Sequence, residues 1–181
     1  MKRYLFNFIF IGIIYTLLMG CNSNTPQISW KEELKSQIPF LGHRNWIVIT
    51  DMAYPLQTKP GIKTFFADES YVDILAHVYQ EIEKAPHIKP VIYQDKELSF
   101  LTDQDAVGID ALKKEMNQLL GNQVESLPHE EIIKRLDEVS QMFSVIIIKS
   151  NLTIPYTSTF FELDCNYWDE KRQKSLDKKM E

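Results

Sequence analysis

The sequence predicts one three-layer α/β/α domain, in which helices cover both faces of a mostly parallel central sheet. Residues 46–50 and 145–148 are apolar or β-branched at odd and even positions alike, as in strands that are buried on both faces. Between short apolar runs of this kind, hydrophobic residues recur every three or four positions, which is the helical period. Strands that alternate with such helices are typical of a layered α/β domain.

The start of the chain predicts a secretory signal. Lys2 and Arg3 precede an apolar stretch over residues 4–19, and a glycine separates this stretch from Cys21. The arrangement indicates a signal peptide over residues 1–20. It resembles the lipobox of bacterial lipoproteins, which implies that Cys21 is lipidated and begins the mature chain. The alternative is an uncleaved signal anchor that ends in an ordinary cysteine.

Lipidation of Cys21 would place the protein in the bacterial cell envelope, on a periplasmic or outer-membrane face, because two or three acyl chains bind a bilayer firmly. Loss of the two basic residues in the signal leaves 18 of the 20 basic side chains against 25 acidic ones, a net charge of −7. This charge argues against nucleic acid as a partner. Cys165 is then the only free thiol, so we expect packing to hold the fold without an internal disulfide.

Strands and helices are predicted in alternation. In chain order, the parts of the protein are a signal peptide (1–20), a lipidated cysteine with a tether (21–29), a domain (30–165) and a charged, solvated tail (166–181). Apolar runs predict strands near residues 46–50, 62–67, 90–93, 144–149 and 157–163. Apolar stripes predict helices over about 70–84, from 109 to a C-cap at Gly121, and from Pro128 onward.

The common cofactor and metal patterns are absent from the sequence. It has no glycine-rich dinucleotide or phosphate loop, no nucleophile-elbow serine and no pair of histidines at helical metal-ligand spacing. We therefore predict no cofactor and no metal. Of the four histidines, His77 lies within a predicted helix and His87 in a proline-flanked loop, so we interpret both as surface or packing residues.

Polar residues meet predicted strands at two places. Gly42-His43 precedes the strand over 46–50, and Asp51 follows it, at the end where open α/β sheets bind ligands. The alternative is that Asp51 caps a turn and His43 is an ordinary loop residue. The second place is the segment 154–158, after the buried strand that ends near residue 149. Its alternative interpretation is a proline turn into an edge strand.

At these two places the chain resembles the ribose pyranase and fucose mutarotase (RbsD/FucU-like) family of sugar-ring isomerases. Gly42-His43, the strand over 46–50, Asp51 and Pro55 match the family pattern in order and spacing, and Pro155-Tyr156 matches after the later strand. The resemblance extends over about residues 38–163. It implies the RbsD-like fold, a monosaccharide as substrate, and a homo-oligomer whose sites lie at subunit interfaces, for which we expect a single ring or a smaller assembly.

The resemblance also implies roles for individual residues. His43 corresponds to the proton donor, and a histidine that titrates near neutrality suits that role. The residues that correspond to substrate contacts are Asp51, Tyr156, Thr157, Ser158 and, at the start of the helix before the last long strand, His129 or Lys134. His129 lies about five residues upstream of the family position, and Lys134 keeps the spacing better. Interconversion of sugar rings needs no metal, nucleotide or covalent intermediate.

The predicted function is therefore that of a membrane-tethered isomerase, which interconverts ring forms or anomers of a free aldose by general acid/base catalysis. The chain departs from the family pattern at three places, where Ser158 replaces an asparagine, Met52 an alanine, and Asn151-Leu152 a Gly-Glu pair. The first and the last of these leave an alternative open. The alternative is a non-catalytic sugar-binding lipoprotein, and a third possibility is an envelope scaffold without a ligand. The catalytic hypothesis requires His43 and Tyr156 to line one cavity.

Overall fold

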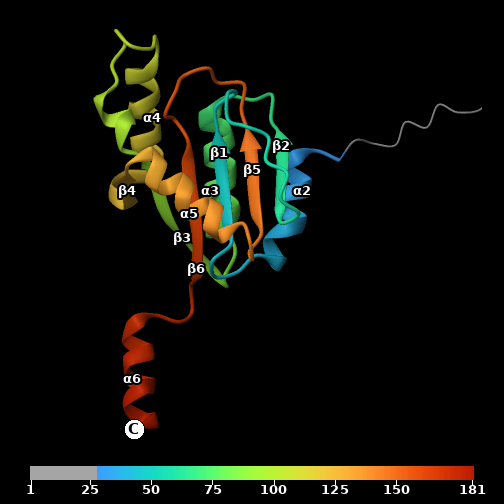
Figure 1. The fold of residues 1–181 in the computed structure, drawn as a ribbon, viewed down its shortest axis with the longest axis vertical. Coiled ribbons are helices and arrows are strands. Elements are labelled where there is room, and N and C mark those ends of the chain that lie inside the picture. The colour runs from blue at the N-terminus through green and yellow to red at the C-terminus, as the bar shows by residue number, and fades with distance from the viewer. Residues whose placement is uncertain (1–27) are drawn as a thin grey trace, which may run out of the picture.

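A six-stranded sheet is the centre of the computed structural model, which describes residues 28–181 (Figure 1). The predicted signal peptide and Cys21 lie outside the described residues. The strands are β1 (Trp46–Thr50), β2 (Ile62–Phe66), β3 (Ile88–Asp95), β4 (Val124–Leu127), β5 (Val145–Lys149) and β6 (Thr159–Cys165). Their order is β2-β5-β1-β6-β3-β4, and β6 runs antiparallel to β1 and β3 while the other neighbours are parallel. This confirms the predicted α/β class with a mostly parallel sheet.

Helices cover both faces of the sheet. The helices are α2 (Trp30–Gln37), α3 (Tyr71–Glu83), α4 (Ile109–Leu120), α5 (His129–Val139) and α6 (Glu170–Met180), with short 3₁₀ helices η1 (Ile38–Phe40), η2 (Lys96–Phe100) and η3 (Gly121–Gln123). Ile47 and Ile49 of β1 pack in one apolar cluster with α2, α3 and α4, whereas Trp46 and Val48 pack in a second cluster with α5. Because alternate residues of a strand point to opposite faces, β1 is buried on both sides, as its sequence predicts.

The helix boundaries follow from local sequence signals. Ser70 accepts a hydrogen bond from the backbone of Asp73 and caps α3. Gly121 ends α4 with a φ of 62°, a conformation that glycine adopts without strain. α5 starts at His129, directly after Pro128, and its buried residues Ile132 and Leu136 lie one helical turn apart. Truncation of such a fully buried side chain to alanine typically costs about 2–5 kcal/mol, so these residues fix α5 against the sheet.

Several elements differ from the sequence prediction. α2 and the edge strand β4 were not expected, and neither was a helix in the tail that was predicted to be solvated. This helix, α6, is capped by Asp169 and buries none of its residues. In Figure 1, α6 projects away from the sheet. The interpretation of residues after Pro155 as an edge strand is wrong, because β6 lies between β1 and β3 and buries Phe160 and Phe161 completely.

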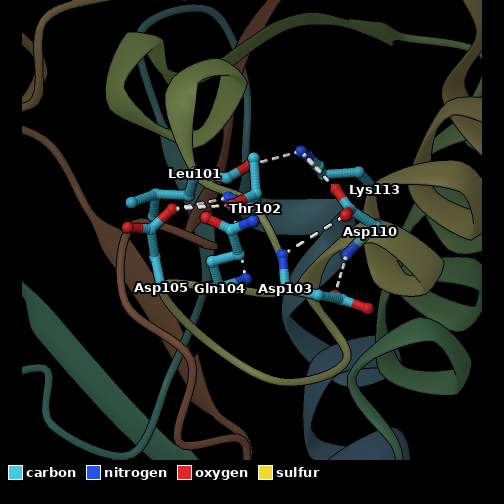
Figure 2. A network of polar contacts seen from close by, with 7 residues as sticks. All are labelled: Leu101, Thr102, Asp103, Gln104, Asp105, Asp110 and Lys113. Atoms are coloured by element: carbon cyan, nitrogen blue, oxygen red, sulfur yellow. Dashed lines mark hydrogen bonds and ion pairs between the residues drawn. The ribbon is translucent and has the colours of Figure 1, made fainter.

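A polar network orders the loop between η2 and α4 (Figure 2). Asp103 and Asp110 each accept a hydrogen bond from the backbone N–H of the other, at 3.0 and 3.2 Å. Asp105 accepts from both the backbone and the hydroxyl of Thr102, and Lys113 pairs with Asp110 at 2.8 Å. Gly108 offers no side chain to cap α4, and the Asp103 carboxylate instead accepts the N–H of Asp110 in the first turn of the helix, where backbone donors lack an intrahelical partner.

Candidate functional site

A cavity lies where the polar ends of three strands meet. It has a volume of about 760 Å³, within the usual range of small-molecule sites, and its lining comes from the loop after β1, the end of β3, the start of α5 and the segment before β6. The sheet register explains this convergence, because Thr159 at the start of β6 pairs with Ile49 near the end of β1 and with Gln94 near the end of β3. The antiparallel strand β6 therefore begins where its neighbours end.

Asp51 lies in the cavity wall and also caps a turn. Its carboxylate accepts a hydrogen bond of 2.7 Å from the backbone N–H of Ala53. The turn interpretation of this residue and its placement in the cavity therefore both hold. The second carboxylate oxygen remains available for a ligand, since a carboxylate accepts several hydrogen bonds.

Tyr156 and Ser158 line the same cavity, whereas Thr157 between them does not. Tyr156 has a φ of 58°, and its side chain remains partly exposed. Thr157 is fully buried: its hydroxyl donates to the backbone oxygen of Ile154, and its own carbonyl accepts from the hydroxyl of Tyr71. Thr157 thus holds the segment in place, and the predicted sugar contact reduces to its two neighbours.

His129, at the first position of α5, is the histidine that lines the cavity. Its ring meets that of Tyr156 edge to face, with centroids 5.6 Å apart. Its backbone N–H donates to both carboxylate oxygens of Glu97, at 3.2 and 3.1 Å. Lys134 is exposed and is not among the lining residues. Spacing along the chain favours Lys134, because it counts residues back from the last long strand. The first residue of α5 is nevertheless His129, and a change in the length of the loop after α5 alters this spacing without moving the start of the helix.

Asp95, at the end of β3, is a site residue that the sequence did not predict. Its side chain is completely buried in the cavity wall, and one oxygen lies 3.1 Å from Nδ1 of His129. The other oxygen, Oδ2, has no hydrogen-bond partner in the described part of the chain. Burial raises the pKa of Asp95 to about 6, although the bond to His129 opposes this shift. The predicted strand ended at Tyr93; the two polar residues that follow it were the available signal.

His43 lies at the opposite end of β1 from the cavity. Its Nδ1 is 2.8 Å from a carboxylate oxygen of Asp164, which Lys89 also contacts, and its side chain is 57% exposed. It is not among the residues that line the cavity. The five residues of β1 alone extend over about 17 Å, so His43 cannot reach the cavity of its own chain. His43 and Tyr156 therefore do not line one cavity in this structure, contrary to the prediction from the sequence.

Two further properties concern only residues 28–181. No group of three or more histidine, cysteine, aspartate or glutamate side chains there is arranged to hold a metal ion. No helix in this range is both long enough and apolar enough to cross a membrane.

Comparison with known proteins identifies the fold. No protein-family model matches the chain, and no curated protein matches it either. Among solved structures, the chain is similar to RbsD of Bacillus subtilis complexed with D-ribose, with 17% identity over 77% of this chain and 97% of that chain and a TM-score of 0.54. It is also similar to the fucose mutarotase of Streptococcus pneumoniae in complex with L-fucose (15% identity, 80% and 98% coverage, TM-score 0.49) and to FucU of Bifidobacterium longum (16% identity, 73% and 93% coverage, TM-score 0.48). The chain has the α/β fold of the RbsD structure, as the sequence resemblance implied.

Proposed function

We propose that this protein binds a free monosaccharide in the cavity between β1, β3 and α5 and interconverts its ring forms or anomers. The observation that carries the proposal is the convergence of Asp51, Asp95, His129, Tyr156 and Ser158 on one cavity that is large enough for a monosaccharide. The shared fold supports it, since the RbsD structure holds D-ribose.

The lining suits the chemistry of a sugar. Carboxylate and hydroxyl groups of Asp51 and Ser158 can bond sugar hydroxyls, and a charged acceptor strengthens such bonds. Met52, Ile133 and Ile154 add apolar surface for the C–H groups of the ring. Opening the ring requires one proton removed from the anomeric hydroxyl and one delivered to the ring oxygen, which general acid/base groups supply without a metal.

We assign His43 to the site of a neighbouring subunit. Within one chain it lies too far from the cavity, whereas the family resemblance implies sites that two subunits complete. Exposed apolar side chains near the cavity support contact with a second copy: Leu56 is 71% exposed, Phe66 54% and Met52 45%. Burial of such side chains is the usual source of affinity between subunits. His43 with Asp164 would then provide a second acid/base group across the interface.

A second candidate function is sugar binding without turnover. It is favoured by the segment that departs from the family pattern, because Asn151 donates to Asp68 and the carbonyl of Leu152 accepts from the backbone of Met52. These groups hold the loop and are not free for a ligand. Ser158, for its part, offers a hydroxyl where the family has an amide.

Exchange NMR with a panel of free aldoses tests the proposal. We expect the wild-type protein to accelerate exchange between ring forms or anomers of at least one aldose, and His129→Gln to abolish this acceleration. Saturation transfer to a sugar without faster exchange would support the binding function in its place. Neither transfer nor exchange with any aldose would contradict both.

Membrane tethering through Cys21 is a separate proposal, which rests on the sequence alone. The short polar segment after Cys21 would connect the lipid to the domain. The anchor and the sugar site are independent, so either can fail without the other.

A further inference from the structure

The two nitrogens of the His129 ring have different surroundings. Nδ1 lies 3.1 Å from Oδ1 of Asp95, whereas no described residue hydrogen-bonds to Nε2. The Asp95 side chain is fully buried, while that of His129 is 29% exposed and lines the cavity. The pair therefore has a buried carboxylate behind the ring and an open ring edge in front of it.

This contact determines where the ring carries its proton. An ionised carboxylate only accepts hydrogen bonds, so Nδ1 of His129 must be the donor to Asp95. A neutral imidazole has one N–H, and the bond made by one nitrogen sets the state of the other. With Nδ1 protonated, Nε2 has a free lone pair and can take up a proton from a ligand.

The backbone of His129 is held by Glu97, which lies in the same stretch of chain as Asp95. Pro128 offers no side-chain cap to α5, and Glu97 instead accepts the N–H of His129 from two residues beyond Asp95. A carboxylate at this position also complements the positive end of the helix. Side chain and main chain of His129 are thus both anchored to the end of β3 and to η2, and the Tyr156 ring lies against the imidazole from the remaining side.

We propose that Asp95 is a positioning residue that keeps His129 in the Nδ1-protonated tautomer, and that Nε2 of His129 is an acid/base atom of the cavity. The inference rests on the proposed function and deepens it, because the family resemblance assigned only substrate contact to His129 and no role to Asp95.

The proton balance of the step is simple. Nε2 takes the proton of the anomeric hydroxyl, the electron pair of that O–H bond forms the carbonyl, and the bond between the anomeric carbon and the ring oxygen breaks. The ring oxygen receives a proton from a second acid, for which His43 of a neighbouring subunit or water is available. Closure on either face of the carbonyl reverses these transfers and returns His129 to its neutral form.

The groups around the pair set its pH range. The charged or titratable side chains that face it are Glu97 from η2, Asp51 and Tyr54 from the loop after β1, Tyr71 from α3, Glu130 from α5, Tyr156 from the segment before β6 and, across a smaller cavity of about 350 Å³ behind Asp95, Lys113 from α4. Burial, Glu97 and Asp51 together raise the pKa of Asp95. Below pH about 6 the carboxyl becomes protonated and can donate to Nδ1, so the proposed tautomer is lost on the acid side.

Nitrogen-15 NMR of the imidazoles tests the tautomer directly. At pH 8 we expect the His129 signals, assigned by their loss in His129→Gln, to show a protonated Nδ1 and an unprotonated Nε2. Asp95→Asn should give a substantial Nε2-protonated fraction, because the asparagine amide can donate to Nδ1. The control Asp137→Asn removes an exposed carboxylate from α5, the helix that His129 begins, and should keep the wild-type protonation of the His129 ring. A wild-type ring protonated mainly at Nε2 would overturn the proposal even if Asp95→Asn does not fold, and so would an unchanged tautomer in Asp95→Asn.

Sugar exchange tests the catalytic part. Sugar exchange by Asp95→Asn should be slower than by wild type by about 10²-fold, which is the usual contribution of a well-placed acid/base group. Sugar binding, measured by saturation transfer, should change by less than about threefold. Equal losses of exchange and binding would reduce Asp95 to a structural residue and overturn its positioning role. If the wild type exchanges no aldose, the proposed function fails, and the tautomer is still decided by the spectrum.

Discussion

Tyr156 and His129 meet edge to face in the cavity, with ring centroids 5.6 Å apart and ring planes at 86°. The contact joins the start of α5 to the segment before β6. Tyr156 reaches it from a left-handed backbone conformation, with a φ of 58°, which costs a non-glycine residue about 1–2 kcal/mol. Strain of this kind at a cavity wall is typical of functional sites.

Tyr156→Gly should therefore separate stability from sugar binding. We expect the free energy of unfolding to stay within about 1 kcal/mol of wild type, because relief of strain offsets the lost ring contact. Sugar affinity should fall at least about tenfold, as the loss of one aromatic contact would cause. Urea unfolding and saturation transfer measure the two effects.

Arg44→Gly is the matched control for the backbone part of this prediction. Arg44 has a φ of 72° and lies away from the cavity, so its replacement tests strain relief without touching the lining. If Tyr156→Gly unfolds far more easily than wild type while Arg44→Gly does not, the ring of Tyr156 is structural and the prediction is wrong.

The raised pKa of Asp95 should make the folded protein less stable as the pH rises. Its pKa is raised from 3.8 to about 6 in the folded protein, so the folded state holds the proton more tightly than the unfolded state does. The associated stability is present below pH about 4 and is lost as the pH increases through about 6. Two pKa units correspond to at most about 3 kcal/mol.

The difference in the free energy of unfolding between Asp95→Asn and wild type should thus shift in favour of Asp95→Asn as the pH rises from about 4 to 6. Above that range the difference should stay constant. Thermal unfolding of both proteins at closely spaced pH values measures the difference. A difference that does not change with pH would mean that Asp95 titrates near its ordinary value, and a difference that shrinks as the pH rises would reverse the sign.

His43 should act in a cavity other than that of its own chain. Alone, His43→Ala and Asp51→Asn should each lose most sugar exchange. Mixed after unfolding and refolding together, they should regain activity in about a quarter of the sites, because random assembly pairs an intact cavity with an intact His43 at that frequency. Exchange NMR on mixtures, with native mass spectrometry to detect mixed assemblies, provides the measurement.

The control mixture is His43→Ala with His43→Gln, in which no pairing can restore the imidazole. Mixed assemblies of the first pair that remain inactive would remove His43 from the site, and a wild-type protein that is monomeric at activity-supporting concentrations would do the same.

Cys21 should carry the membrane anchor. Mass spectrometry of the protein from bacterial envelopes should show a mature chain that begins at acylated Cys21. Cys21→Ser should keep the signal and lose the lipid, while the isolated domain keeps the same exchange rate for sugars. An unmodified Cys21 within an uncleaved chain would favour the signal-anchor alternative.

Most of the fold was predictable because buried strands leave a dense apolar signal. The run over β1 and that over β5 are hydrophobic on both faces, and the stripes of α3, α4 and α5 have the helical period. α2 buries only Leu34 in the described structure, and β4 is a four-residue edge strand with two exposed polar residues. Elements that bury so little leave too weak a pattern in the sequence, although Ser29 and Glu32 do form a capping box at the start of α2.

The candidate site was only partly predictable. Asp51, Tyr156 and Ser158 were found because strand ends and the family pattern mark them, and each lines the cavity. Asp95 was missed because its strand is two residues longer than its apolar run. His43 precedes β1 and Asp51 follows it, so the length of the strand separates the two residues. The sequence motif contains both residues and does not reveal that only Asp51 lies at the cavity end of the strand.

His43 and the cavity that we propose for sugar lie at opposite ends of β1 in each copy, and this placement has a kinetic consequence. If turnover needs groups from two molecules, dilution below the dissociation constant of the assembly would abolish activity while every copy is still folded. Confinement to a surface would then act as a concentrating device, since it keeps neighbouring copies within reach of one another.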